Sequence, residues 1–545
     1  MLSRCLGHRA PLLWLVLPMM VGLTVGKAGD IAPVGWLLAG AFISAVVAVI
    51  MSGHHPSRFA VATVIGMVLA GMASYALHRP RLAAWDQLPP REARLSLRVD
   101  RIFHHSDSRR AGGLATIVRA DSPVEELAGQ RVQFSLTLRN GETAPVRSAV
   151  VSTLGVLVSL PRNPPTSTFD GYLANAGINF RLTRGRLLAE EKPASAYYLF
   201  CARQATRFAR LLGVGVDAKR PDLVGVLRAM LLGQQHELSD DQTTIFRQSG
   251  TMHVFSISGL HIAVIAAGLH ALLSLFRLPR ALQFIGGLAA LWMYVDITGA
   301  APSAVRAFVM VAVVEVAFVS RLPRNPLSAL VTSALIILLI DPLQMFSASF
   351  QMSYGIVAAL LLLGLPLADC WLERGALFRD LPKVTWGWHR RAIDTVWRAL
   401  IGAAAIGTAA SLVSTVTGVL FFGLFTPGSF LANLWLIPAS SLVIYMGMLS
   451  LIFGLAGWVA GSDLANHAAV LILWGVDFGI RHSVDLPVMW YSATFRMSGL
   501  GALTLTALLL TIGWGYARNW QGMQRGYWAP FTVVALVLIF GVTYP

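Results

Sequence analysis

The sequence has few of the side-chain patterns that catalytic sites and metal sites require. The chain has three cysteines, Cys5, Cys201 and Cys370, too few and too scattered for a disulfide framework or a zinc site. It has no G-x-x-x-x-G-K-[ST] loop, so no ATPase motor of that type is evident. It also lacks the H-E-x-x-H metal motif and the G-x-S-x-G motif of serine hydrolases. We therefore expect no catalytic residues, no metal and no cofactor.

Charged residues are also scarce, at 13% of the 545 residues, whereas hydrophobic residues make up 55% and the mean hydropathy is +0.63. Soluble domains are less apolar, so lipid must be part of the solvent of this chain. Apolar runs of about 15 to 25 residues, near the length that a bilayer core requires, recur at 11–26, 31–51 and 59–77 and repeatedly after residue 253. We expect a polytopic α-helical membrane protein with about 11 to 12 transmembrane helices.

The remaining charge is unbalanced, with 43 basic and 27 acidic residues and a formal net charge of +16. This excess suits an anionic partner, and it equally suits cytoplasmic loops at anionic lipid headgroups. Arg4 and Arg9 precede the first apolar run as in a secretory signal, but two further runs follow, so we interpret residues 1–78 as N-terminal transmembrane helices. Because Lys and Arg favour cytoplasmic loops, we expect a cytoplasmic N-terminus and an extracytoplasmic segment at 79–192.

Hydrophobicity falls in the segment 79–192, and apolar and polar residues alternate there as in short strands. Five strands in about a hundred residues suit a small β-barrel of the OB type, although other small β domains fit nearly as well. The expected strands are 93–104, 114–120, 131–138, 150–160 and 178–188.

Residues 193–250 are expected to form amphipathic helices, and residues 251–545 a transmembrane channel domain. The expected helices of the first segment are 197–212, 222–232 and 239–248, with Ser239 as the N-cap of the last. In the channel domain we expect 430–459 to form one helix that contains Pro438, because two helices there would invert the charge bias of the loops that follow.

Polar side chains within apolar runs are costly, and they therefore mark buried polar sites or water-filled paths. We interpret 249–270 as one helical span in which Ser258 and His261 share a face. These two side chains either bond across a helix interface or line a polar path. Gln351 and Asn433 allow the same two interpretations.

Arg306 is the one arginine within the apolar runs of this central region, and it shares a helix face with Ser303. Pro302 is placed near the start of that helix, where proline is tolerated. The guanidinium either extends to lipid headgroups or holds a phosphate or carboxylate as a bidentate donor. Asp296 is a candidate to neutralise it.

Five short sequence blocks occur in a characteristic order along the chain. They are FDGYLANAGI from residue 169, GTMHVFSISGLH from 250, TGAAPSAVRAF from 298, DPLQMFSASFQMSYG from 341 and ANLWLIP from 432. In number and order these blocks resemble the ComEC family of competence channels.

The resemblance implies an inner-membrane channel that passes single-stranded DNA into the cytoplasm during natural transformation. It also implies partners besides DNA and membrane lipids: a periplasmic DNA receptor, a cytoplasmic motor or single-strand-binding protein, and a second copy of the chain in an oligomer. The residues that it suggests for the DNA path are His253, Ser256, Ser258, His261, Asp296, Ser303, Arg306, Gln351 and Asn433.

The chain departs from many members of that family at its end. Those continue into a metallo-β-lactamase-like domain, the suspected nuclease, whereas this sequence stops at Pro545 soon after an apolar run. A short natural form, a separate nuclease subunit or a truncated reading frame would each explain this ending. The competing function is a permease for a small polar or anionic solute, which internal inverted repeats would favour; none is evident.

Overall fold

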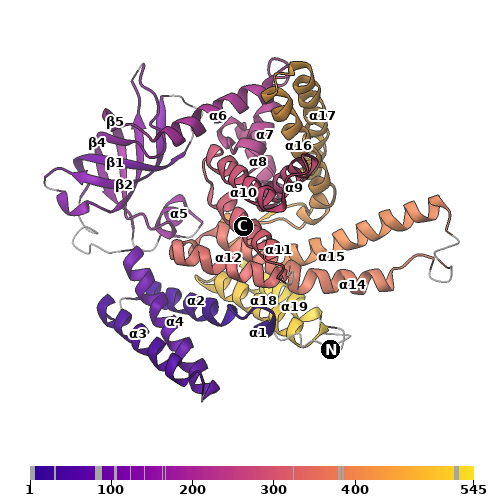
Figure 1. Ribbon diagram of the computed structural model, residues 1–545, viewed down its shortest axis with the longest axis horizontal. Helices are drawn as coiled ribbons and strands as arrows, with labels where there is room; N and C mark the ends of the chain where they lie inside the picture. The colour runs from indigo at the N-terminus through magenta and orange to yellow at the C-terminus, as the bar shows by residue number, and fades with distance from the viewer. Residues whose placement is uncertain are drawn as a thin grey trace.

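The computed structural model describes residues 6–29, 32–53, 55–79, 89–103, 107, 109–122, 124–139, 141–161, 164–165, 167–322, 325–378, 382, 386–520 and 527–544. Arg4, Cys5 and Pro545, the start of the expected insert at 80–88, and residue 104 at the end of its first strand lie outside this range. Figure 1 shows a β-barrel beside a larger helical body.

The barrel is a closed sheet in the order β1-β2-β3-β5-β4, in which β4 pairs back to β1. All its pairings are antiparallel except that of β3 with β5. Inward-facing residues of alternating strands, such as Leu95, Phe134 and Leu182, fill the interior. The strands are β1 (Arg91–Phe103), β2 (Arg110–Ala120), β3 (Arg131–Thr137), β4 (Val150–Ser159) and β5 (Phe180–Lys192).

One short helix, α5 (Phe169–Asn175), interrupts the connection from β4 to β5. Its N-cap is Thr168, whose side chain accepts a hydrogen bond from the backbone of Gly171 at 3.1 Å. This connection contacts the helical body, because Gly177, at φ +77°, lies so close to Leu343 that an added Cβ would come within 2.5 Å of that side chain.

Helices make up most of the rest of the described chain. Two short sheets also occur, one of β6 (Leu424–Phe425) with β7 (Tyr491–Ser492) and one of β8 (Thr494–Phe495) with β9 (Val542–Thr543). The helices before and after the barrel in the sequence are α1 (Leu6–Arg9), α2 (Leu13–Ala28), α3 (Val34–Met51), α4 (Pro56–His78), α6 (Ala196–Gly213), α7 (Pro221–Leu232) and α8 (Asp240–Gln248). Those of the central region are α9 (Gly259–Leu275), α10 (Arg280–Ile297), α11 (Pro302–Val319), α12 (Pro326–Ile340), η4 (Pro342–Phe346), α13 (Ala348–Ala359), η5 (Leu360–Gly364) and α14 (Leu365–Arg374). The last are α15 (Trp388–Phe422), α16 (Ser429–Leu455), α17 (Val459–Val484), α18 (Leu500–Ala517) and α19 (Trp528–Phe540).

Eight helices of the described chain are long and apolar enough to cross a membrane, and four shorter apolar helices accompany them. The predicted fold class, a polytopic helical membrane protein with an inserted small barrel, is therefore confirmed. The single helix expected around Pro438 is confirmed too, since α16 runs through that proline without a break.

The helices form two bundles with separate apolar cores. The first bundle is built from α6 to α10 with α16 and α17, and the second from α2, α12, η4, α13, η5, α15, α18 and α19. Helix α11 belongs to both, because Ala304 and Ala307 pack into the first core whereas Val309 and Met310 pack against the second. We call the boundary along α11 the seam.

One expected helix is wrong at its start. The interpretation of 249–270 as one span fails because α9 begins only at Gly259. Residues 249–258 form an irregular segment, which we call the leading loop, and it contains glycine at φ +71° in position 250. That conformation ends a helix, so α8 cannot continue into α9.

Candidate functional site

Arg306 lies at the seam, in the second turn of α11, and its side chain is buried with only 1% of the residue exposed. Burial excludes the interpretation in which this arginine extends to lipid headgroups. Its guanidinium crosses to the second bundle, where Nη1 donates to Gln344 Oε1 at 3.4 Å and Nη2 donates to the hydroxyls of Ser349 and Ser353. Arg306 therefore links the two bundles.

All of these acceptors are neutral. No carboxylate of the described residues lies within 4 Å of Arg306, and its Nε has no hydrogen-bond partner there. The nearest acid in the network is one step away, where Gln344 donates to Asp341 at 3.1 Å. A buried cation held only by neutral groups is costly, and an anion could satisfy it better than they do.

The expectation that Asp296 neutralises Arg306 is wrong. Asp296, at the end of α10, instead accepts hydrogen bonds from Arg147 Nη1 at 2.8 Å and from the Tyr197 hydroxyl at 2.9 Å. Arg147 belongs to the barrel and also lies 4.8 Å from the centroid of the Tyr198 ring. These contacts fasten the barrel to the first bundle, and we call them the barrel clamp.

Tyr197 stays protonated within the barrel clamp. Burial, together with the hydrogen bond to Asp296, raises the pKa of Tyr197, so its hydroxyl stays a donor. One helical turn further along α6, burial also raises the pKa of the Cys201 thiol. Neither Arg147 nor Tyr197 was among the residues expected at the site, because no local pattern shows which partner a buried carboxylate meets.

Ser258 and His261 have a local role that the sequence interpretation did not include. Ser258 is the N-cap of α9, and its hydroxyl lies 2.8 Å from Nδ1 of His261 at position N3. The pair forms a capping box, an arrangement that satisfies free backbone donors of a first helical turn. The two side chains therefore bond to each other within one helix end rather than across a helix interface.

Contacts from both sides hold the leading loop. The Ser303 hydroxyl donates to the carbonyl of Ile257 at 2.8 Å, which ties the loop to α11. At the other end, an added Cβ on Gly250 would collide with Thr426 and Ser429 at the start of α16. Within the loop, His253 Nδ1 lies 3.2 Å from the Gly250 carbonyl, and Ser256 donates to the carbonyl of residue 253 at 3.4 Å.

The two remaining candidates lie on either side of this loop. Gln351, in α13, donates to the carbonyl of Met345 at 3.2 Å, close to the acceptors of Arg306. Asn433 lies one turn into α16, and its Oδ1 is buried without a hydrogen-bond partner in the described chain. Asp296 apart, the candidates thus gather around the leading loop, the seam and the start of α16.

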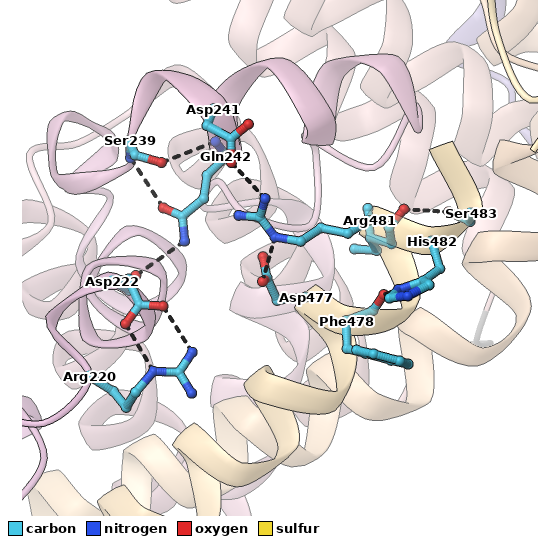
Figure 2. A network of polar contacts seen from close by, with 11 residues as sticks. Arg220, Asp222, Ser239, Asp241, Gln242, Asp477, Phe478, Arg481, His482 and Ser483 are labelled. Carbon is cyan, nitrogen blue, oxygen red and sulfur yellow. Dashed lines mark hydrogen bonds and ion pairs between the residues drawn. The ribbon is translucent and has the colours of Figure 1, made fainter. Parts of the chain in front are cut away.

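A polar network fixes the helix that precedes the leading loop (Figure 2). Ser239 caps α8 as expected, and Gln242 completes a capping box and reaches the carbonyl of Asp222 at 3.3 Å. From α17, Arg481 bonds both Asp241 at 2.6 Å and Asp477 at 2.8 Å. The network ties α7, α8 and α17 together.

A hollow of about 250 Å³ lies where α15 of the second bundle meets α16 of the first. Three hydroxyls of α15 line it, from Thr408, Ser411 and Thr415, and they follow one another at helical spacing. None of the nine predicted residues lines this hollow. The repeated hydroxyl residues were the signal in the sequence that could have identified it. Nor do the described residues contain a cluster of acids, histidines and cysteines suited to a metal ion.

Several known proteins match part of this chain. Competence protein ComA of Neisseria gonorrhoeae is 28% identical over 322 residues, which cover 54% of this chain and 41% of that protein. ComE operon protein 3 of Bacillus subtilis is 32% identical over 142 residues, 26% of this chain and 18% of that protein. Recombination protein 2 of Haemophilus influenzae is 26% identical over 317 residues, 55% of this chain and 37% of that protein.

The chain spans less than half the length of each of these relatives. No solved structure matches it. Residues 230–522, which include the leading loop, α11 and the start of α16, match the family described as competence protein. Since this match covers more than half of the chain, the protein belongs to the competence protein family.

Proposed function

We propose that this protein conducts single-stranded DNA across the inner membrane during DNA uptake, and that the strand passes along the seam between the two bundles. The observation that carries the proposal is Arg306, a buried cation on the seam whose described partners are all neutral. Membership of the competence protein family and the relative named competence protein ComA support the same function.

The chemistry of the site suits a strand that must move. A phosphate that reaches Arg306 would replace weak contacts to an amide and two hydroxyls with charge-assisted hydrogen bonds. Those neutral groups remain close by, so the guanidinium can return to them when the phosphate leaves. Binding that is favourable yet reversible is what conduction through a pore requires.

The proposal includes an orientation and a set of partners. The N-terminus lies in the cytoplasm, and the barrel lies outside, where a DNA receptor delivers the strand. Because the sequence contains no phosphate-binding motor loop, a cytoplasmic motor or single-strand-binding protein draws the strand inward. The protein acts as a conduit rather than an enzyme.

The test is uptake of labelled DNA by cells that lack this protein and are complemented with variants at equal membrane abundance. Loss of the protein should leave DNA bound outside and block import, wild type should restore import, and Arg306→Met should not. Arg280→Met is the matched control, since Arg280 is an exposed arginine at the start of α10. Normal import without the protein would refute the proposal.

A further inference from the structure

A pair of aromatic rings stands exposed on α5, where the barrel meets the helical body. Phe169 and Tyr172 are stacked with their ring centroids 5.9 Å apart and an angle of 21° between the ring planes. They are 48% and 38% exposed. Large apolar rings in water are costly, so a ligand that covers them would gain free energy.

Two arginines flank the pair. The Arg181 guanidinium lies 5.5 Å from the centroid of the Phe169 ring and bonds Asp170 at 2.8 Å. Arg101, from the end of β1, donates to the Tyr172 hydroxyl at 3.4 Å and is not paired with a carboxylate in the described chain. We call the two rings and these two arginines the platform.

More cations lie where α5 and η4 approach each other. Lys27 of α2 donates to Asn175 at 2.9 Å and sits 4.2 Å from the centroid of the Phe346 ring. Arg79, after α4, is buried and donates to the Tyr75 hydroxyl at 3.1 Å, while its Nε has no partner in the described chain.

Charge in this area is strongly unbalanced. Among the described residues, two carboxylates are paired with cations near α5 and η4: Asp170 with Arg181, and Asp341 with Arg131 at 3.9 Å. The described residues therefore leave three cations without an acid: Lys27, Arg79 and Arg101. An anionic ligand fits this balance.

The platform also stands in line with the seam. Helix η4, which contacts the segment after α5, carries Gln344, the residue that accepts from Arg306. A chain-like anion held by α5 and followed along η4 would thus arrive at Arg306. The connection from β4 to β5 is moreover a segment with which OB-type barrels bind oligonucleotides.

We infer that the platform binds single-stranded DNA by stacking nucleobases on Phe169 and Tyr172 while Arg101, Lys27 and Arg79 hold the phosphates that follow. Stacking accounts for the exposed rings, and phosphate contacts account for the unbalanced cations. The inference rests on the proposed function for the direction of travel. Binding itself is measured without transport.

The experiment uses the full chain in nanodiscs of neutral lipid and fluorescence anisotropy of two labelled probes. One probe is a twelve-nucleotide oligothymidine and the other an abasic strand of the same length. Wild type should bind the oligothymidine more tightly, because only bases can stack. Phe169→Ala with Tyr172→Ala should remove at least about tenfold of that preference and leave the abasic strand unaffected.

Two more variants separate stacking from charge. Arg101→Gln should weaken the binding of both probes and flatten the dependence of affinity on salt, because one phosphate contact is lost. Trp388→Ala is the matched control, since this ring is exposed on α15 in the hairpin that extends away from the barrel (Figure 1), and it should bind both probes like wild type.

Equal affinity of wild type for both probes would overturn the inference, and so would an unchanged preference in the double alanine variant. If binding follows the expected pattern but cells without the protein import DNA normally, the proposed function fails and the platform stands. If the expected binding pattern is absent but cells without the protein fail to import DNA, the platform inference is rejected and the proposed function stands.

Discussion

Arg306 is a buried cation whose described partners are an amide and two hydroxyls, and such a group lowers stability unless something else offsets its desolvation. Arg306→Met keeps much of the volume and removes the charge. We therefore expect its melting temperature in detergent to equal or exceed that of wild type, while DNA import falls at least about tenfold. A melting temperature that falls together with import would make Arg306 a structural residue and remove it from the path.

A second prediction for a single residue concerns Ser258, because its hydroxyl is part of the capping box of α9. Ser258→Ala should destabilise the protein by about 1 kcal/mol, the usual cost of a lost N-cap. Ser258→Asp keeps the cap and adds a negative charge, so we expect it to retain both thermal stability and import. A stable Ser258→Asp variant that blocks import would instead place this side chain beside the strand, where a carboxylate repels phosphate.

Single residues also show how much of the site could be predicted from the sequence. The N-cap at Ser239 and the helix start at Pro302 follow from local rules and are confirmed. The partners of Asp296 and Arg306 were not predictable, because even the nearest of them, Tyr197 and Gln344, are 99 and 38 residues away along the chain. The capping role of Ser258 was not predictable, because a continuous apolar run does not distinguish a packed loop from a helix.

The barrel clamp gives the clearest prediction at the scale of secondary-structure elements. In a variant whose only cysteine is Cys201, the buried thiol should react slowly with a maleimide, because burial raises its pKa and blocks access. Asp296→Asn weakens the clamp to Arg147, so alkylation should accelerate at least about tenfold as the barrel and α6 loosen. Arg94→Ala, which breaks an exposed barrel ion pair, is the control and should alkylate like its parent.

The network around α8 makes a comparison between two arginines possible. Arg481→Ala leaves Asp477 largely buried without its partner, so it should destabilise by about 1–3 kcal/mol, and adding Asp477→Asn should recover part of the loss. Arg220→Ala breaks a solvent-exposed pair and should cost about 0–1 kcal/mol. Thermal unfolding of the three variants decides this, and equal effects would contradict it.

That exposed pair also has a pH dependence. Arg220 lowers the pKa of Asp222 below its usual value, so the folded state favours the charged carboxylate. The pair therefore contributes at neutral pH, and the contribution is lost as the pH falls through the lowered pKa. The stability difference between wild type and Arg220→Ala should shrink in acid, and a difference that grows there would contradict the pairing.

Elements were predictable where a local period is strong. All five barrel strands were placed within a few residues of their observed bounds, because apolar and polar residues alternate with the period of a half-buried strand. The start of α9 was not, because a continuous apolar run has no period that separates a packed loop from a buried helix. The available signal in the sequence was Gly250, which lies ahead of α9 and adopts φ +71° in the structure.

At the scale of the whole molecule, hydropathy predicts many helices but not their grouping. The division into two bundles depends on which apolar faces meet, and nearly uniform apolar helices carry little of that information. The seam and the hollow between α15 and α16 follow from this grouping, so the sequence alone could name Arg306 but could not place it at a boundary.

The path along the seam is tested most directly by photo-cross-linking to a strand in transit. Labelled single-stranded DNA, arrested by a bulky group at its trailing end, is offered to cells that carry benzoylphenylalanine at Ser353 beside Arg306 or at Ser411 in the hollow. Position 471 on α17, where Leu471 is 67% exposed on the outside of the helical body, is the control. Cross-links to DNA at Ser353 and Ser411 but not at Leu471 are expected. Absence of cross-links at both Ser353 and Ser411, or equal cross-linking at Leu471, would contradict a path between the two bundles.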